Sequence, residues 1–278
     1  MRISSVLKLI GAIALAGLVH ITPVYAQNAI VVVSDLHLMF GNADHPNQRA
    51  FNNFLKIIKT DPEITDVIVN GDIFHVPTLR HVDRSQRITL VIEVLRQIQR
   101  ETGARVHFNF GNHDQLTEKK QGRSSVDESF SAELKDAAEK AGIAVIGTDP
   151  HRIYEYRIGN TKFEISHFPF ATSKSMVGQA ERFSSNRRAF IKVTDVSQQI
   201  VENDGVVRIM SDSHTPLMDV DLNVFNTGKL AETIDLPQEP NTFLVVRNGQ
   251  GRLMTVHDNG TVSRFRFRKS YSCSDLFL

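Results

Sequence analysis

The sequence predicts a single α/β domain made of two packed sheets, and three observations support this prediction. Apolar strands alternate with amphipathic helices between residue 29 and about residue 146, which is typical of parallel strands covered by helices. Beyond His151 the pattern changes to a hairpin followed by short alternating strands. No linker rich in proline or glycine separates the two parts, so we expect them to pack together as one domain.

The composition of the chain argues against an extended polyanionic partner. Lysine and arginine number 32, and aspartate and glutamate number 31, so the charges nearly balance. A polynucleotide track or an anionic membrane surface is usually bound by an excess of positive charge. Hydrophobic residues make up 41% of the 278 residues, which suffices for a large core. Because Cys273 is the only cysteine, no intramolecular disulfide is expected.

The first 26 residues are typical of an export signal. Arg2 and Lys8 lie in and around its start, residues 9–19 are apolar, and Val24-Tyr25-Ala26 fits the small-residue rule for cleavage. The alternative is an uncleaved membrane anchor, but the apolar stretch is short for a membrane span. We therefore predict a signal peptide over residues 1–26 and a mature domain over residues 27–278. The mature protein is expected in the periplasm or secreted, with no stable membrane span.

The first half of the mature domain alternates between strands and helices. The predicted strands cover residues 29–34, 66–70, 106–110 and 144–146. Helices are predicted between them, around residues 51–58, 83–102 and 126–141. The first strand is a continuous apolar run of the kind that is buried on both faces. Gly103 is expected to end the second helix, since glycine readily adopts the left-handed conformation found after helices.

The second half is richer in strands. Residues 152–158 and 161–166 form a predicted hairpin about Gly159-Asn160, a common sequence for a tight turn. A further helix is predicted at about residues 184–202, and a strand follows at residues 206–210. The remaining segments are predicted antiparallel strands at residues 242–246, 251–256 and 261–267.

Five of the predicted strands end in residues that bind metals. These residues are Asp35 and His37, Asp72, Asn112 and His113, His167, and Asp212 with His214. Ligands of an open α/β sheet gather outside the carboxyl ends of its strands, so we expect these side chains to meet. A single such residue is more often a turn or cap residue, but five strand ends share the property here. Mixed carboxylate, imidazole and amide ligands suit manganese, iron or zinc.

The segment Gly111-Asn112-His113-Asp114 carries the most specific chemistry. Asn112 offers a neutral amide oxygen to a metal, and His113 can donate a proton near neutral pH. We expect the carboxylate of Asp114 to hold the imidazole of His113 in its productive tautomer. The alternative is an ordinary turn, because Gly-Asn is also common turn chemistry.

In order along the chain, these motifs resemble those of calcineurin-like metallophosphoesterases. The matching motifs are Asp35-x-His37, Gly71-Asp72, Gly111-Asn112-His113-Asp114, His167 and a final x-His214. The resemblance covers about residues 30 to 228. It implies a four-layer α/β/β/α sandwich of two mixed sheets and a dinuclear metal centre.

The resemblance also implies a role for each residue. The first metal would be held by Asp35, His37, Asp72 and His214. The second would be held by Asp72, which bridges the two, together with Asn112, His167 and Asp212. A hydroxide bridging the metals would attack phosphorus, and His113, oriented by Asp114, would protonate the leaving oxygen. The expected activity is hydrolysis of a small phosphomonoester or phosphodiester.

One position departs from the family pattern. The last motif usually reads Gly-His-x-His, whereas this chain has Ser211-Asp212-Ser213-His214. Asp212 adds a negative charge, which favours a harder cation such as manganese or magnesium. We expect Asp212 to bind the second metal, and the alternative is a weak or empty second site. The rival interpretation of the whole chain is a catalytically degenerate family member that binds phosphate or a partner.

Overall fold

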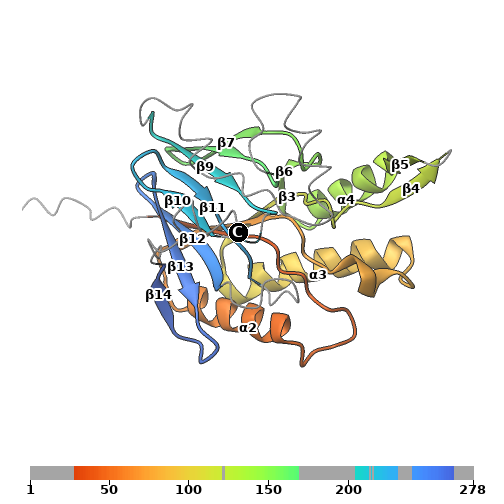
Figure 1. Cartoon of the computed structure of the whole chain (residues 1–278), viewed down its shortest axis with the longest axis horizontal. Helices are drawn as coiled ribbons and strands as arrows, with labels where there is room; N and C mark the ends of the chain where they lie inside the picture. Colours follow the sequence, from red (N-terminus) through yellow and green to blue (C-terminus); the bar gives the residue numbers. More distant parts are fainter. Residues whose placement is uncertain are drawn as a thin grey trace, which may run out of the picture.

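The computed structural model describes residues 28–120, 123–168, 204–212, 214, 216–230 and 240–265. These residues form two mixed sheets that pack face to face, and helices cover the outer face of the larger sheet (Figure 1). The predicted signal peptide, the predicted helix at residues 184–202 and Cys273 lie outside the described residues.

The larger sheet has seven strands in the order β14-β13-β12-β1-β2-β3-β6. Its parallel part consists of β1 (Ala29–Val33), β2 (Ile64–Asn70), β3 (Arg105–Asn109) and β6 (Ala144–Gly147). Its antiparallel part consists of β12 (Asn241–Arg247), β13 (Gln250–Val256) and β14 (Val262–Arg264). The predicted parallel and antiparallel strands are therefore confirmed, and they join in one sheet because β12 pairs with β1.

The smaller sheet has five strands in the order β10-β11-β9-β8-β7. Its strands are β7 (Tyr154–Ile158), β8 (Thr161–Ile165), β9 (Val206–Met210), β10 (Leu217–Asp219) and β11 (Val224–Asn226). The predicted hairpin is confirmed, since β7 and β8 pair antiparallel on either side of residues 159 and 160. β9 runs parallel to both β8 and β11, which makes this sheet mixed as well.

Three α-helices cover the larger sheet: α2 (Pro46–Lys59), α3 (Arg84–Thr102) and α4 (Glu128–Lys140). The predicted limits of α3 are confirmed by its caps. The side chain of Asp83 accepts a hydrogen bond from the Gln86 N–H at 2.8 Å, and Gly103 ends the helix with a φ of 71°. Asp127 caps α4 in the same way.

β1 separates the two cores of the molecule. Val31 and Val33 face the helices, where they join a cluster that includes Phe54 and other side chains of α2, α3 and α4. Ile30 and Val32 face the smaller sheet and join a second cluster. The strand is thus buried on both faces, as its sequence predicts. The described residues form an α/β/β stack, and the helix predicted at residues 184–202 lies outside them.

A two-stranded hairpin after the segment Gly111-Asn112-His113-Asp114 was not predicted from the sequence. β4 (Thr117–Lys120) and β5 (Arg123–Val126) pair antiparallel and project away from the two sheets (Figure 1). Their residues are mostly polar and do not alternate with apolar ones, so the usual strand signal is absent. A short 3-10 helix, η1 (Val76–Leu79), was also not predicted.

A buried polar cluster links the larger sheet to β7. His107 lies on β3, with its Nε2 atom 2.7 Å from Asp66 Oδ1 and its Nδ1 atom 2.9 Å from the Tyr156 hydroxyl. Arg105 donates a further hydrogen bond to Asp66 Oδ2 at 3.0 Å. Burial opposes ionisation of Asp66, but hydrogen bonds from His107, Arg105 and Thr65 outweigh it and lower the pKa of this carboxyl to about 2.

The substitution Asp66→Asn is expected to lower the free energy of unfolding by about 1–3 kcal/mol at pH 7, since it weakens charged hydrogen bonds. A folded-state pKa of about 2 lies below the unfolded value, so this stabilisation is present at neutral pH and is lost as pH falls from about 4 toward 2. Denaturant unfolding at pH 7 and pH 3 measures both effects. A difference between wild type and variant that stays constant with pH would contradict this prediction.

Candidate metal centre

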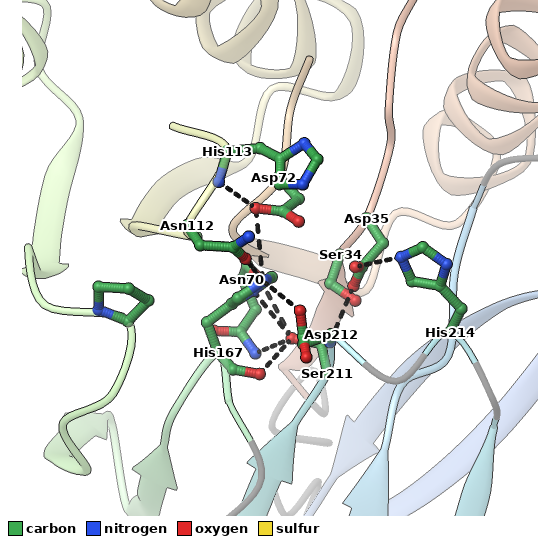
Figure 2. A network of polar contacts seen from close by, with 12 residues as sticks. Ser34, Asp35, Asn70, Asp72, Asn112, His113, His167, Ser211, Asp212 and His214 are labelled. Atoms are coloured by element: carbon green, nitrogen blue, oxygen red, sulfur yellow. Dashed lines mark hydrogen bonds and ion pairs between the residues drawn. The ribbon is translucent and has the colours of Figure 1, made fainter. Parts of the chain in front are cut away.

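The predicted ligands follow the carboxyl ends of strands from both sheets, and the structure brings them to one place. Asp35 follows β1, Asp72 follows β2 and Asn112 follows β3 in the larger sheet. His167 follows β8 and His214 follows β9 in the smaller sheet. Figure 2 shows the side chains of these residues and of Asp212 gathered around one point between the sheets.

The first group consists of Asp35, His37 and His214, whose ligand atoms all lie within 4.8 Å of one another. The Nε2 atoms of the two histidines are 3.1 Å apart. Asp35 Oδ1 lies 3.2 Å from His214 Nε2 and 3.7 Å from His37 Nε2. Two imidazole nitrogens and a carboxylate oxygen that converge in this way are suited to hold one cation.

The second group consists of Asp35, Asp72 and His167, whose ligand atoms also lie within 4.8 Å of one another, so Asp35 is shared by the two groups. His167 Nε2 lies 3.4 Å from Asp72 Oδ1 and 3.2 Å from Asn112 Oδ1. Asp212 Oδ1 lies 4.0 Å from the same nitrogen. The other oxygen of Asp72, Oδ2, lies 3.8 Å from His37 Nε2. The carboxylate of Asp72 therefore faces histidines of both groups, as expected of a bridging ligand.

Hydrogen bonds behind His167 fix which nitrogen faces the centre. Its Nδ1 atom donates to the backbone oxygen of Asn70 at 2.7 Å, so Nε2 is left to face Asp72 and Asn112. Ser211 Oγ lies 3.2 Å from the same Nδ1, and it accepts a hydrogen bond from the Asn70 side chain at 2.8 Å. Such outer contacts orient metal-binding histidines in many proteins.

These supporting residues were missed in the sequence. Asn70 is fully buried at the end of β2, and Asn109 is fully buried at the paired position of β3. The side chain of Asn109 donates to that of Asn70 at 2.8 Å. The available signal was an asparagine at the last position of each of two neighbouring buried strands.

The backbone at the centre adopts an unusual conformation. Asp35, His37, Asp72, Asp212 and His214 have φ values between 41° and 63°. In the described part of the chain, only two other non-glycine residues have positive φ. The left-handed region is costly for such residues, and this cost is concentrated at the predicted ligands.

Two glycines allow the loops after β2 and β3 to touch. A Cβ atom on Gly111 would collide with the backbone and carboxylate of Asp72. A Cβ atom on Gly71 would collide with the Gly111 backbone and lie 2.7 Å from His167 Nδ1. Gly71 also has a φ of 82°, which glycine adopts without strain. The glycine in each motif is thus required by close packing around Asp72.

The electrostatics of the centre fit bound cations. Asp35 is fully buried, and its Oδ1 atom has no hydrogen-bond partner among the described residues. Burial, together with the charges of Asp35 and Asp72, raises the pKa of Asp212 to about 6. Three carboxylates packed this closely repel one another unless positive charge lies between them. The donor set of carboxylate, imidazole and amide oxygen suits manganese, iron or zinc.

The expected contact between Asp114 and His113 is not observed, which corrects the role predicted for Asp114. Oδ2 of Asp114 accepts hydrogen bonds from the backbone N–H groups of Asp72 at 2.8 Å and Gly111 at 2.9 Å. Its Oδ1 accepts from the Ile73 N–H at 3.0 Å. The left-handed turn at Asp72 leaves these N–H groups without strand partners, and the buried carboxylate satisfies them. Asp114 therefore positions the Asp72 loop.

His113 lies beside the centre as predicted. Its backbone N–H donates to Asp72 Oδ1 at 2.9 Å, and its ring packs edge-on against that of His37 with centroids 5.0 Å apart. Burial lowers the pKa of His113, despite the opposing charge of Asp72. The ring is thus adjacent to both groups of ligands without being a member of either.

Two mixed sheets thus carry adjoining groups of candidate metal ligands at their strand ends, as a metal-dependent hydrolase requires. The family model for calcineurin-like phosphoesterases matches residues 29–277 of the sequence. The chain belongs to this family of metal-dependent hydrolases.

Solved structures of low sequence identity are similar to this chain. A dimetal phosphatase from Danio rerio is 10% identical, with a TM-score of 0.42 and coverage of 85% of this chain and 95% of that chain. The nuclease MPE from Pseudomonas putida is 13% identical, with a TM-score of 0.39 and coverage of 86% of this chain and 92% of that chain. A phosphopantetheinyl hydrolase from Mycobacterium tuberculosis is 15% identical, with a TM-score of 0.32 and coverage of 66% of this chain and 67% of that chain. No curated protein sequence matches the chain significantly.

Proposed function

We propose that this protein is an exported phosphoesterase that hydrolyses a small phosphomonoester or phosphodiester at a centre of two divalent metals. The observation that supports this most strongly is the position of Asp72. Its two carboxylate oxygens face histidines of the two groups, with Oδ2 3.8 Å from His37 Nε2 and Oδ1 3.4 Å from His167 Nε2. A bridging carboxylate is what a pair of metals a few ångströms apart requires.

The residues divide between the two metals as the family motifs imply. The first metal would be held by Asp35, His37, Asp72 and His214. The second would be held by Asp72, Asn112, His167 and Asp212. When bound, the two cations supply Lewis acidity and lower the pKa of water enough to provide a nucleophile near neutral pH. Manganese, iron and zinc are the metals that this donor set favours, with manganese favoured by the additional carboxylate of Asp212.

His113 is the residue that we assign to proton transfer. Its backbone N–H donates to Asp72 Oδ1 at 2.9 Å, which keeps the residue beside the two groups of ligands, where a substrate phosphoryl group would bind. A bound phosphoryl group brings negative charge, which favours the protonated imidazole and opposes the effect of burial on the pKa of His113. In that form His113 donates a proton to the leaving oxygen, and Asp114 acts indirectly by holding the Asp72 loop.

Asp212 is proposed as a ligand of the second metal, and the substitution Asp212→Ala tests this. Removing one of four ligands, and a negative charge, is expected to reduce bound manganese from two ions to one per chain. Elemental analysis after dialysis measures the ratio. The variant Asp212→His, which restores the usual family residue, should keep two ions and shift the preference toward zinc. Two ions per chain in Asp212→Ala would contradict the assignment.

The substrate class is tested by comparing a phosphomonoester, a phosphodiester and a short oligonucleotide. Each would be assayed with manganese, zinc, iron or a chelator. Chelator-sensitive hydrolysis of the small esters and little of the oligonucleotide would support the proposal. Preference for the oligonucleotide would favour a nuclease instead. Tight binding of two metals with no hydrolysis of any ester would favour the degenerate, phosphate-binding alternative.

Export is proposed from the sequence of residues 1–26 alone. Among the described residues, no helix is long and apolar enough to cross a membrane. Mass spectrometry of the protein recovered from the producing cells tests this proposal. A mature chain that begins at Gln27 and lies outside the cytoplasm is expected, whereas an intact chain retained in the cytoplasm would contradict it.

A further inference from the structure

A third group of possible ligands lies beside the two already described, and it consists only of histidines. One ring nitrogen from each of His37, His75 and His113 lies within 4.8 Å of the others. The ring centroids are 5.9 Å apart for His37 and His75, 5.0 Å for His37 and His113, and 6.3 Å for His75 and His113. His75 lies three residues after Asp72, and the sequence motifs assign it no metal.

The backbone holds His75 next to His37. The segments that follow β1 and β2 continue to pair beyond the strands, because the Leu38 N–H donates to Ile73 at 2.9 Å and the His75 N–H donates to Leu38 at 3.1 Å. η1 begins directly after His75, whose backbone oxygen accepts from the Thr78 N–H at 3.0 Å. The position of His75 is therefore fixed on both sides, independently of its ring.

Two ring nitrogens of these histidines are buried without a hydrogen-bond partner among the described residues. They are Nδ1 of His37, a residue that is only 4% exposed, and Nδ1 of His113. The Nε2 atom of His37 faces Asp35 and His214, so Nδ1, the other nitrogen of the ring, is the one that can bind a cation outside the first group. A buried polar atom without a partner is costly, and a cation bound between the rings would remove that cost.

The donor set distinguishes this group from the main centre. It contains three imidazoles and no carboxylate, which suits zinc, copper or nickel better than manganese or magnesium. Three histidines with an open fourth position are a common arrangement for zinc. The main centre, by contrast, has three carboxylates and can accept manganese.

We propose that His37, His75 and His113 form a third metal site, specific for zinc and similar metals, and that a cation bound there stops hydrolysis. When the first metal is also bound, His37 bridges the two cations as an imidazolate, and its ring proton is released to solvent. Inhibition follows because the cation occupies the imidazole of His113, which then cannot deliver a proton to the leaving oxygen. The inhibitory effect rests on the function proposed above, whereas the binding of the third cation does not.

Zinc binding at equilibrium tests the site without any measurement of activity. The purified protein would be dialysed against zinc and analysed for bound metal, beside His75→Phe, His75→Gln and the control His81→Phe. His81 is an exposed histidine of the same segment. We expect the wild type and His81→Phe to bind one more zinc ion per chain than either His75 variant. Equal zinc content in the wild type and both His75 variants would overturn the proposal.

Inhibition of hydrolysis by zinc tests the inhibitory role proposed for the third cation. Hydrolysis would be measured in saturating manganese with increasing zinc, and each variant would be compared with its own rate in manganese alone. The wild type is expected to be inhibited at zinc concentrations at least about tenfold lower than the His75 variants, which lack one of three ligands. Zinc that displaces manganese from the main centre would inhibit all variants alike, and this result would overturn the inhibitory role.

The two measurements separate this proposal from the proposed function. If the protein hydrolyses phosphoesters but binds no extra zinc through His75, the proposed function is supported and the third metal site is refuted. If the protein binds the extra zinc through His75 but hydrolyses no phosphoester, the third metal site is supported and the proposed function is refuted.

Discussion

The substitution Asp72→Asn is expected to abolish hydrolysis and to leave less than one metal bound per chain. Asp72 is 1% exposed and faces both groups of ligands through its two oxygens. Asparagine replaces one of these oxygens by an NH2 group, which repels a cation, and it removes the negative charge that balances both metals. The loss of rate should be at least about a thousandfold, the upper range found when a single electrostatic stabiliser is removed.

Asp66→Asn is the matched control for this experiment. Asp66 is a buried aspartate of β2, and its hydrogen bonds go to residues of the polar cluster away from the metal centre. This variant should keep two metals and most of the activity, although it is less stable. Metal analysis and hydrolysis, with circular dichroism to verify folding, distinguish the two variants. Two metals and a wild-type rate in Asp72→Asn would contradict the bridging role.

The substitution His113→Gln is expected to lower the rate of hydrolysis by about a hundredfold to ten-thousandfold, the usual contribution of general acid catalysis. Metal content should stay at two ions per chain, because the ring of His113 belongs to neither ligand group of the main centre. Its hydrogen bond to Asp72 comes from the backbone and survives the substitution. A loss of rate without a loss of metal would therefore separate His113 from the ligands.

The leaving group provides a sharper test of this role. An alkyl phosphate needs a proton on its leaving oxygen, whereas nitrophenolate leaves readily without one. His113→Gln should therefore slow hydrolysis of an alkyl ester far more than hydrolysis of a nitrophenyl ester. Equal losses for both esters would show that His113 acts in binding or positioning and not as the general acid.

The position of the centre could be predicted because it depends on local signals. Apolar runs such as residues 29–33 identify strands, and the polar residues that follow them must lie at the same edge of a sheet. The spacing within Asp35-x-His37 and the order of the motifs then identify the family. None of these steps requires knowledge of the loop conformations.

The contacts of Asp114 could not be predicted, because they depend on the conformation of the loop that follows β2. Its carboxylate binds N–H groups that are exposed by the left-handed turn at Asp72, and a φ of 57° at an aspartate is not visible in a sequence. The grouping of His75 with His37 and His113 has the same origin, because it follows from pairing of two loops beyond the ends of their strands.

The burial of Asp66, His107 and Tyr156 in one polar cluster could not be predicted for a different reason. A histidine and an aspartate at alternating positions of predicted strands suggest a surface-facing side of the sheet. In the structure this side faces the smaller sheet, and Tyr156 of β7 supplies the partner that makes burial of His107 possible. The packing of one sheet on the other, which is not encoded in any local pattern, decides this environment.

The most direct test of the dinuclear centre is a titration of the metal-free protein with manganese, in which hydrolysis of a phosphoester is followed against the number of ions bound. We predict that the protein is inactive without metal, that activity rises with the second ion, and that it reaches its maximum at two ions per chain. Full activity in the presence of a strong chelator, or maximal activity with a single bound ion, would contradict a two-metal phosphoesterase.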